Sequence, residues 1–389
     1  MNKIYDLEGK NKAIVLFKFF AALLITYSHM ALLFPKYSGL VTGGAIGDGL
    51  FFFCSGFTLF LGRDGGFMNW YKRRVSRIYP SIIMWALLSA VAFGWIWNVT
   101  DLITTPRYWF IPCIMVYYAI FYLIRRFLMR YMKVVFYGAF ILITILSFFI
   151  LDMNNSVMYA QVSFMRIYYF MFMLLGAITA LDLQKTDDQM IFGGLRRFAV
   201  RGGYLNEELR IKNEESVGLR PIGNEELRIK NEESVGFRPI GNEELRIRGE
   251  ELSAKKSFLL FFGSLVLYYA CMAIYKLGAF WCHFQMVSLI PLLLAIYYFF
   301  MLCSCKKMVM VFDKPWMGNV VYFISALTLE IYLVQYALFT DKMNFVFPLN
   351  LPVMYLMIFG VAYALKCLSQ VFSQVFGGGE FEVKGIFKI

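Results

Sequence analysis

The chain has 389 residues, of which 60% are hydrophobic, 19% are aromatic and only 16% are charged. This composition excludes a soluble globular domain, and it indicates a membrane protein with many spans. The formal charge of +12 belongs to the membrane region and its short loops, and we expect no nucleic-acid partner. The seven cysteines form no C-x-x-C pair, which favours buried or lipid-facing thiols over a metal site or a disulfide framework.

Stretches of about 20 mainly apolar residues recur along the chain, and each can span a bilayer as a helix. We place ten of them near residues 13–34, 46–62, 78–98, 108–125, 133–151, 164–182, 257–276, 280–303, 316–340 and 352–375. The expected fold is therefore all-α, a polytopic bundle of about ten transmembrane helices. It divides into an N-terminal membrane half with six helices (1–182), an insertion (183–256) and a C-terminal membrane half with four helices and a short tail (257–389).

Basic residues in the connecting loops predict how these spans are oriented. Loops on the side of the two termini hold twelve Lys and Arg, namely Arg63, Lys72, Arg73, Arg74, Arg77, Arg125, Arg126, Arg130, Lys133, Lys306, Lys307 and Lys314. The opposite loops hold four, namely Lys36, Arg107, Lys276 and Lys342. Because cytoplasmic loops carry the excess of positive charge, we expect a multi-pass protein of the cytoplasmic (inner) membrane with both termini in the cytoplasm.

A different kind of sequence separates the sixth span from the seventh. The segment NEELRIKNEESVGLRPIG at 206–223 recurs at 224–241 with one change, Leu219 against Phe237, and a degraded third copy begins at Asn242. Three units this short cannot bury much core. We therefore expect 183–256 to be a weakly ordered cytoplasmic insertion rather than a binding module.

Ionisable side chains inside the apolar stretches are the first candidates for a site, because such groups are costly in hydrocarbon and usually face a functional cavity. Lys18 and His29 share the first stretch, about 20° apart around a helix and about 16 Å apart along it. The predicted orientation places His29 toward the outer face. Asp48, Arg166 and Glu330 also fall in the outer halves of their spans. They are candidates to meet His29 in an outer-facing cavity, and pairing between helices is the equally weighted alternative.

Three motifs near the start of the chain form a recognisable series. Lys18 and His29 are separated by ten positions, FF-x-SGF occupies 52–57, and R-x-x-R followed by a proline occupies 74–80. This series resembles the acyltransferase 3 family, multispan membrane acyltransferases that mostly O-acylate cell-surface carbohydrates. Arginine is the common residue at the first motif position in that family, so Lys18 departs from the pattern and lacks the bidentate fork of an arginine.

Weaker similarities to the family continue downstream. The segments 108–118 and 169–177 resemble its Trp-Phe stretch and its phenylalanine–glycine span, and 324–338 resembles its late Ser…Tyr-Leu-Val-His element. Gln335 stands where histidine is frequent in that last element. This difference argues against a second catalytic histidine in the span.

The resemblance implies an integral membrane O-acyltransferase, with acetyl as the expected group. It would move the acyl group from cytoplasmic acyl-CoA (acetyl-CoA) to a hydroxyl of an extracytoplasmic polysaccharide or lipid-linked sugar, with no metal. A neutral imidazole can take the hydroxyl proton near physiological pH, so His29 is the candidate base. Asp48 or Glu330 would orient its ring or raise its basicity. Arg166 and Trp109 are candidates for binding the acceptor.

The predicted donor site consists of basic residues near the cytoplasmic side. Arg73, Arg74 and Arg77 suit the phosphates of coenzyme A, and Lys18 is the inner-leaflet partner. Membrane topology alone also explains a basic inner loop.

Two functional classes stay open at this point. The acyltransferase is favoured by the resemblance, and the alternative is a transporter or flippase that binds a polar glycan-related substrate with the same buried groups. Lys366 in the last span and His283 near the eighth are interpreted as snorkelling or interfacial residues.

Overall fold

The computed structural model describes residues 11–60, 65–105, 108–150, 157, 164–183, 250–274, 285–376 and 382–387. Across these ranges the regular structure is entirely helical, which confirms the predicted all-α polytopic fold. Seven of the described helices are long and apolar enough to cross a membrane, and one bent pair would make eight. The predicted number of ten is therefore not confirmed. The repeats at 206–247 and His283 lie outside the described residues.

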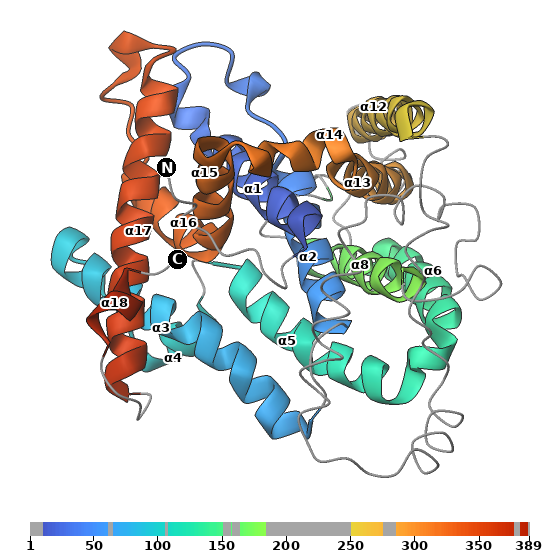
Figure 1. The fold of residues 1–389 in the computed structure, drawn as a ribbon, viewed down its shortest axis with the longest axis horizontal. Coiled ribbons are helices and arrows are strands. Elements are labelled where there is room, and N and C mark those ends of the chain that lie inside the picture. The colour runs from blue at the N-terminus through green and yellow to red at the C-terminus, as the bar shows by residue number, and fades with distance from the viewer. Residues whose placement is uncertain are drawn as a thin grey trace.

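Eleven longer helices form the bundle in Figure 1. They are α1 (Lys12–Ser28), α2 (Gly44–Phe60), α3 (Phe67–Phe93), α5 (Phe110–Leu123), α6 (Met132–Ile150), α8 (Phe170–Asp182), α12 (Glu250–Ile274), α13 (Leu289–Cys303), α15 (Pro315–Ala326), α16 (Thr328–Leu338) and α17 (Asn350–Phe376). Shorter helices are α4 (Val99–Thr104), α7 (Met165–Tyr168), α14 (Lys306–Val309) and α18 (Val383–Ile386). Single turns of 3₁₀-helix occur at Met30–Leu33, Ser38–Leu40, Met129–Tyr131, Met310–Asp313 and Asn344–Val346, and a π-helical turn at Ile124–Leu128.

Helix α1 packs against α2, α13, α15 and α16, and Figure 1 shows it between α15 and α2. Asn11 caps its first turn by accepting a hydrogen bond from the backbone N–H of Ile14 at 3.2 Å. The fully buried ring of Phe17 anchors the helix in an aromatic cluster, 5.2 Å from Phe53 and 5.6 Å from Phe300 between ring centroids. The helix that ends beside His29 is therefore a fixed part of the core.

The α-helical part of the first span is shorter than predicted. Regular α-helix ends at Ser28, whose hydroxyl donates 2.7 Å to the carbonyl of Ile25, and the chain then tightens into a 3₁₀ turn. His29 is thus the residue at which the helix ends, and it does not lie within a continuous helix over 13–34.

Glycines allow α2 and α8 to approach at backbone distance. A Cβ at Gly56 would overlap the backbone carbonyl of Met173, and a Cβ at Gly176 would overlap that of Phe53. No side chain larger than hydrogen fits at either position. The glycine of the SGF motif is therefore required by packing between these helices.

The predicted ninth span, 316–340, is broken in the structure. Helices α15 and α16 meet at an angle of 74° around Leu327. Near the break the hydroxyl of Thr328 donates 2.8 Å to the carbonyl of Ser325, and that of Ser325 donates 2.8 Å to the carbonyl of Tyr322. Such side-chain bonds satisfy the carbonyls that a broken helix frees inside a membrane.

Two other predicted boundaries change because helix continues past the apolar stretch. α3 begins at Phe67 rather than near 78, since the basic turn before the span is helical as well. The predicted spans 108–125 and 133–151 form α5 and α6, joined by the π-helical and 3₁₀ turns without an extended loop. Figure 1 shows the chain curving through these turns so that α5 and α6 point in different directions.

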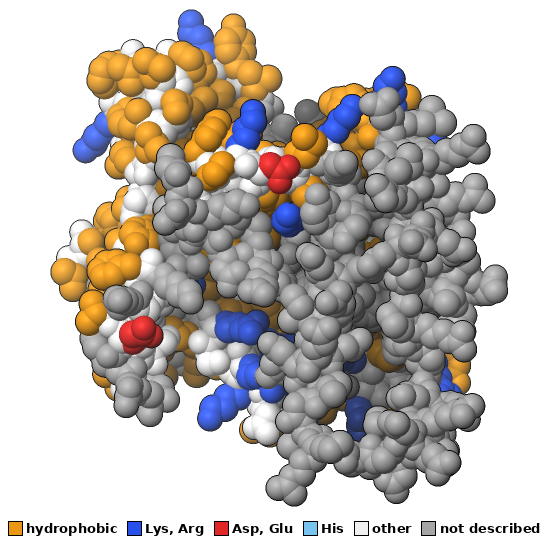
Figure 2. Space-filling view, in the orientation of Figure 1, with side chains coloured by type: hydrophobic (Ala, Val, Ile, Leu, Met, Phe, Trp, Pro, Cys, Tyr) orange, Lys and Arg blue, Asp and Glu red, His pale blue; other side chains and the backbone are white. Residues whose placement is uncertain are grey.

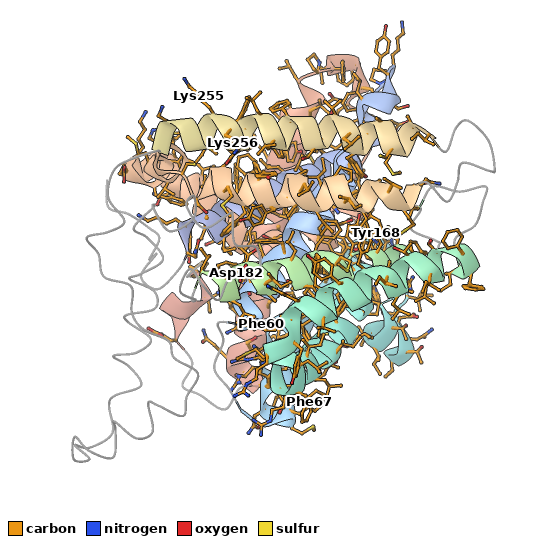
Figure 3. All side chains as sticks on the ribbon, turned by 90° about the vertical axis from the view of Figure 1, so that its right-hand side faces the viewer. Phe60, Phe67, Tyr168, Asp182, Lys255 and Lys256 are labelled. Carbon is orange, nitrogen blue, oxygen red and sulfur yellow. The ribbon has the colours of Figure 1, made fainter. Side chains whose placement is uncertain are left out.

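Figure 3 shows α12, α13, α8 and α6 running side by side, in agreement with their contacts. Asp182 and Phe60 lie toward the end of the bundle where α12 carries Lys255 and Lys256, and Tyr168 lies toward the opposite end. The loops that follow α2 and α8 and the loop that precedes α12 are predicted to share one side of the membrane, and these helix ends do lie on the same side of the bundle. That this side faces the cytoplasm stays a prediction.

Candidate functional site

His29 is hydrogen-bonded to a tyrosine of the broken span. The hydroxyl of Tyr336 on α16 lies 2.8 Å from Nε2 of His29, and the ring centroids are 4.7 Å apart. His29 is partly exposed and Tyr336 is 38% exposed, so a molecule can reach both. A neutral imidazole has one donor and one acceptor nitrogen. The hydroxyl at Nε2 therefore couples the tautomer of His29 to the proton of Tyr336.

The tyrosine partner belongs to a rigid aromatic group. The ring centroid of Tyr336 lies 6.3 Å from that of Tyr332 and 6.2 Å from that of Tyr108. The hydroxyl of Tyr108 accepts a 2.7 Å hydrogen bond from Nε1 of Trp85 and donates one of 2.7 Å to the carbonyl of Leu333. These bonds tie α3, the start of α5 and α16 together, so the frame around Tyr336 is fixed.

Asp48 lies in the same region, on α2. Its carboxyl accepts a hydrogen bond from Tyr169 and acts electrostatically on the hydroxyls of Tyr332 and Tyr336. Helices α1 and α2 run antiparallel, with Gly44 beside Ser28. Asp48 is therefore placed about one turn deeper along α2 than the level of His29. It interacts electrostatically with Tyr336, which in turn is hydrogen-bonded to His29.

Of the two residues predicted to bind the acceptor, Trp109 contacts Tyr169 and Arg166 precedes Tyr169 by three residues. The ring of Trp109 stacks on Tyr169 with centroids 5.7 Å apart and planes 27° apart, which joins it to the Asp48 group. Arg166 contributes its backbone carbonyl, which accepts hydrogen bonds from the hydroxyl of Tyr117 and, at 3.5 Å, the thiol of Cys113. Its guanidinium is exposed.

Glu330 is engaged elsewhere. Its Oε1 accepts a 2.8 Å hydrogen bond from the hydroxyl of Ser81 and forms a 3.1 Å ion pair with Nζ of Lys366. Tyr336 is six positions after Glu330, which is about 120° around α16. The carboxylate is thus satisfied between α3, α16 and α17, on a different face from His29. Lys366, which we expected to snorkel, is its ion-pair partner.

The predicted donor arginines form a cluster on α3. Nη1 of Arg74 donates 3.0 Å to the carbonyl of Trp70, and its guanidinium lies 4.1 Å above the Trp70 ring. Arg73, Arg77 and Arg125 are all electrostatic neighbours of Arg74. Figure 2 shows Lys and Arg side chains gathered on this face in the region where α3 runs in Figure 1. Guanidinium groups arranged in this way can bind phosphate oxygens.

Lys18 lies far from His29 and close to the SGF motif. It acts electrostatically on Cys54, whereas the neighbouring Ser55 lies within hydrogen-bonding reach of Tyr118. Tyr118 in turn interacts with Arg74 and Arg77. The motif on α2 therefore lies between Lys18 and the arginines, and the structure brings the predicted donor residues to one region. In the part of the chain that the structure describes, no group of three or more His, Cys, Asp or Glu could hold a metal ion.

Sequence reasoning missed Tyr336, Tyr169 and Arg125. Tyr336 follows Gln335 in a segment already singled out for its similarity to the family, so proximity to that motif was an available signal. In the sequence Arg125 is one of several basic loop residues, and nothing there distinguishes it from Arg126 or Arg130. Tyr169 had no signal beyond its place in an aromatic stretch.

Comparison with known proteins gives a family match for the N-terminal part of the chain. The family model described as an acyltransferase domain, Acyl_transf_3, matches residues 11–200, which are 190 of the 389 residues. Neither the curated proteins nor the solved structures include a match. The matched segment contains α1 to α8 and the motifs around Lys18, His29, Gly56 and Arg74. The chain is therefore a multi-pass membrane protein whose residues 11–200 are similar to the acyltransferase 3 family.

Proposed function

We propose that this protein is a membrane O-acyltransferase that transfers an acyl group, with acetyl the expected one, from cytoplasmic acyl-CoA. The acceptor is a hydroxyl of an extracytoplasmic polysaccharide or lipid-linked sugar. The observation that carries the proposal is the hydrogen bond between His29 and Tyr336, at an accessible position inside the acyltransferase family segment and its neighbouring helix α16. The arginine cluster around Arg74, which suits the donor, lies in a different region of the protein.

In the proposed reaction His29 acts as the base. The acceptor hydroxyl oxygen attacks the thioester carbonyl carbon, and its proton passes to the imidazole, either directly or through the Tyr336 hydroxyl. The carbon–sulfur bond then breaks, and the imidazolium returns the proton to the departing coenzyme A thiolate. The products are the sugar ester and free coenzyme A, and His29 is regenerated as the neutral base.

Arg73, Arg74 and Arg77 bind the coenzyme A phosphates in this proposal, because guanidinium groups form strong charge-assisted bonds to phosphate oxygens. Lys18, on the other side of the SGF motif, adds positive charge where the donor enters the bundle. His29 lies 11 residues further along α1 and its following turn, about 16 Å in rise. The extended pantetheine arm would carry the thioester over this distance.

The acceptor side comprises Trp109, Arg166 and Asp48. The ring of Trp109 offers an apolar face to a sugar, and the exposed guanidinium of Arg166 can bind its oxygens. Asp48 acts on the pair of His29 and Tyr336 through its electrostatic effect on the Tyr336 hydroxyl. Glu330 has no chemical role in the proposal, because Ser81 and Lys366 already occupy its carboxylate.

This assignment places the protein in the cytoplasmic membrane with both termini and the arginine cluster inside, as the distribution of loop charges favours. It is tested in cells that express the gene or lack it, by mass analysis of the surface glycan. Cells with the wild-type protein should carry an ester that the deletion strain lacks, and His29→Gln at equal protein level should not restore it. An ester unaffected by the deletion contradicts the proposed activity.

The broken helix α15–α16 is the specific observation that favours a transporter or flippase as the second candidate. Discontinuous helices with polar groups near a break are common at transporter substrate sites, and the two helices meet here at 74°. A transporter would move an already modified substrate, so purified protein would not make an ester from acetyl-CoA. Formation of that ester by purified protein favours the enzyme.

A further inference from the structure

Helix α16 carries a buried side-chain amide, Gln335, directly before Tyr336 in the chain. Gln335 on α16 is completely buried, and neither Nε2 nor Oε1 has a hydrogen-bond partner among the described residues. Glu330 and Tyr336 on the same helix are both hydrogen-bonded. Burying an amide without partners is costly, and a membrane interior supplies no bulk water to satisfy it. Among the described residues neither orientation of the amide gives its NH₂ group an acceptor, which makes Gln335 a candidate to bind a polar group of the substrate.

The position of Gln335 relates it to the reacting groups. At 100° per residue its side chain leaves α16 about 60° from Tyr332 and 100° from Tyr336. Both tyrosines interact electrostatically with Asp48. Gln335 is therefore beside the site on the buried side of α16.

A second unpartnered group comes from the other helix that forms the site. The hydroxyl oxygen of Thr26 on α1 is fully buried and has no hydrogen-bond partner in the described structure. Thr26 precedes His29 by three residues, about 60° around the helix and about 4.5 Å along it. Helix α1 packs against α16. The two helices that supply His29 and Tyr336 thus each supply an unsatisfied polar side chain.

The direction of α1 indicates which part of a substrate meets these groups. Thr26 lies on the Lys18 side of His29, and Lys18 lies near the SGF motif and the arginine cluster. A thioester that enters from that end reaches Thr26 before it reaches His29. The acceptor hydroxyl meets His29 at its accessible side.

We propose that Nε2 of Gln335 donates a hydrogen bond to the carbonyl oxygen of the acyl group during transfer, with the Thr26 hydroxyl as a second donor. This inference rests on the proposed acyltransferase function. When the acceptor oxygen bonds to the carbonyl carbon, the carbonyl electron pair moves to its oxygen and charge develops there. A fixed amide donor in a water-poor site stabilises that charge, and it releases the oxygen when the carbon–sulfur bond breaks. Because an amide cannot take up a proton at neutral pH, Gln335 does not replace His29 as the base.

The test uses the full-length protein in lipid nanodiscs, with acetyl-CoA as donor and deacetylated surface glycan as acceptor. Gln335→Met keeps the length of the side chain and removes the amide. It should lower kcat by a factor on the order of 10²–10³ and leave the KM for acetyl-CoA nearly unchanged. Gln374→Met is the matched control, because the Gln374 amide bonds Glu382 at the far end of α17. It should retain wild-type kinetics.

A spectroscopic readout separates carbonyl binding from a structural effect. Acetyl-CoA labelled with carbon-13 at its carbonyl is bound to His29→Gln protein, which should not turn over, and the carbonyl stretch is measured by difference infrared spectroscopy. A hydrogen bond from Gln335 lowers the stretching frequency, and the band should return to higher frequency when Gln335→Met is added. If Gln335→Met leaves the carbonyl band unchanged, or if its kinetic defect is confined to KM, the role of Gln335 is overturned. The proposed function still stands in that case, provided that transfer by the wild type depends on His29. Absence of transfer by the wild-type protein overturns both.

Discussion

The hydroxyl of Tyr336 lies 2.8 Å from Nε2 of His29, although 307 residues separate the two in the chain. The bond joins the end of α1, inside the segment matched by the acyltransferase family, to α16, which lies outside that segment. A site that needs both residues therefore needs both membrane halves of the chain.

We predict that Tyr336→Phe lowers acyl transfer about ten- to a hundred-fold, because His29 loses the hydroxyl that is hydrogen-bonded to its Nε2 and can relay its proton. Rates are measured with purified protein at saturating acetyl-CoA. Tyr355→Phe is the matched control. It removes a similar part-buried hydroxyl that donates 2.9 Å to the carbonyl of Leu23 on α1, away from His29. Equal rates for the Tyr336 variant and the wild type would show that the bond has no catalytic role.

The ion pair of Glu330 and Lys366 gives a prediction about stability. Lys366→Met should destabilise the protein by on the order of 3 kcal/mol, because it leaves a carboxylate with 1% exposure beside α3 without its cation. The double variant with Glu330→Gln should recover much of that loss. Unfolding is followed in detergent by heating. Transfer per folded molecule should stay near the wild-type rate in the double variant. A loss of kcat in the folded double variant would instead show that Glu330 has a catalytic role.

The close approach of α2 and α8 predicts a steric effect at the SGF motif. Gly56→Ala places a Cβ against the backbone carbonyl of Met173, so the helices must separate and the yield of folded protein should fall sharply. Gly138→Ala in α6 is the control, since no atom lies within 4 Å of a Cβ at that position. Monodispersity in detergent is the measurement. A wild-type yield of monodisperse Gly56→Ala protein would show that the motif glycine is not required for packing between α2 and α8.

The arginine cluster predicts a defect in donor affinity. Arg74→Ala with Arg77→Ala should weaken the binding of coenzyme A at least ten-fold, and the affinity of the wild type should fall with salt, as charge-assisted phosphate contacts require. Binding is measured by calorimetry in nanodiscs. Arg130→Ala, on the 3₁₀ turn before α6, controls for a change in net charge. If the double variant and the control bind coenzyme A equally well, the arginine cluster only sets the orientation of the spans and does not bind the donor.

Apolar length and charge were sufficient to predict the class of fold, because a bilayer requires helices of about 20 apolar residues. They could not predict where helix continues beyond the apolar stretch, as in the basic turn at the start of α3. Nor could they predict the break at Leu327, where neither proline nor glycine marks the position.

The site was predictable in part for a similar reason. Spacing within one helix relates Lys18 to His29, whereas Tyr336 reaches His29 only through tertiary packing. The pair of Glu330 and Lys366 did carry a signal, since opposite charges in two apolar helices often neutralise each other.

The most direct test of the central claim is acetyl transfer by purified protein reconstituted in sealed vesicles, with labelled acetyl-CoA on one side and glycan on the other. The account predicts labelled glycan only when acetyl-CoA is on the side of the arginine cluster and glycan on the side of His29, and no label with His29→Gln. Undiminished transfer by His29→Gln protein that binds acetyl-CoA normally would contradict the assignment of His29 as the base.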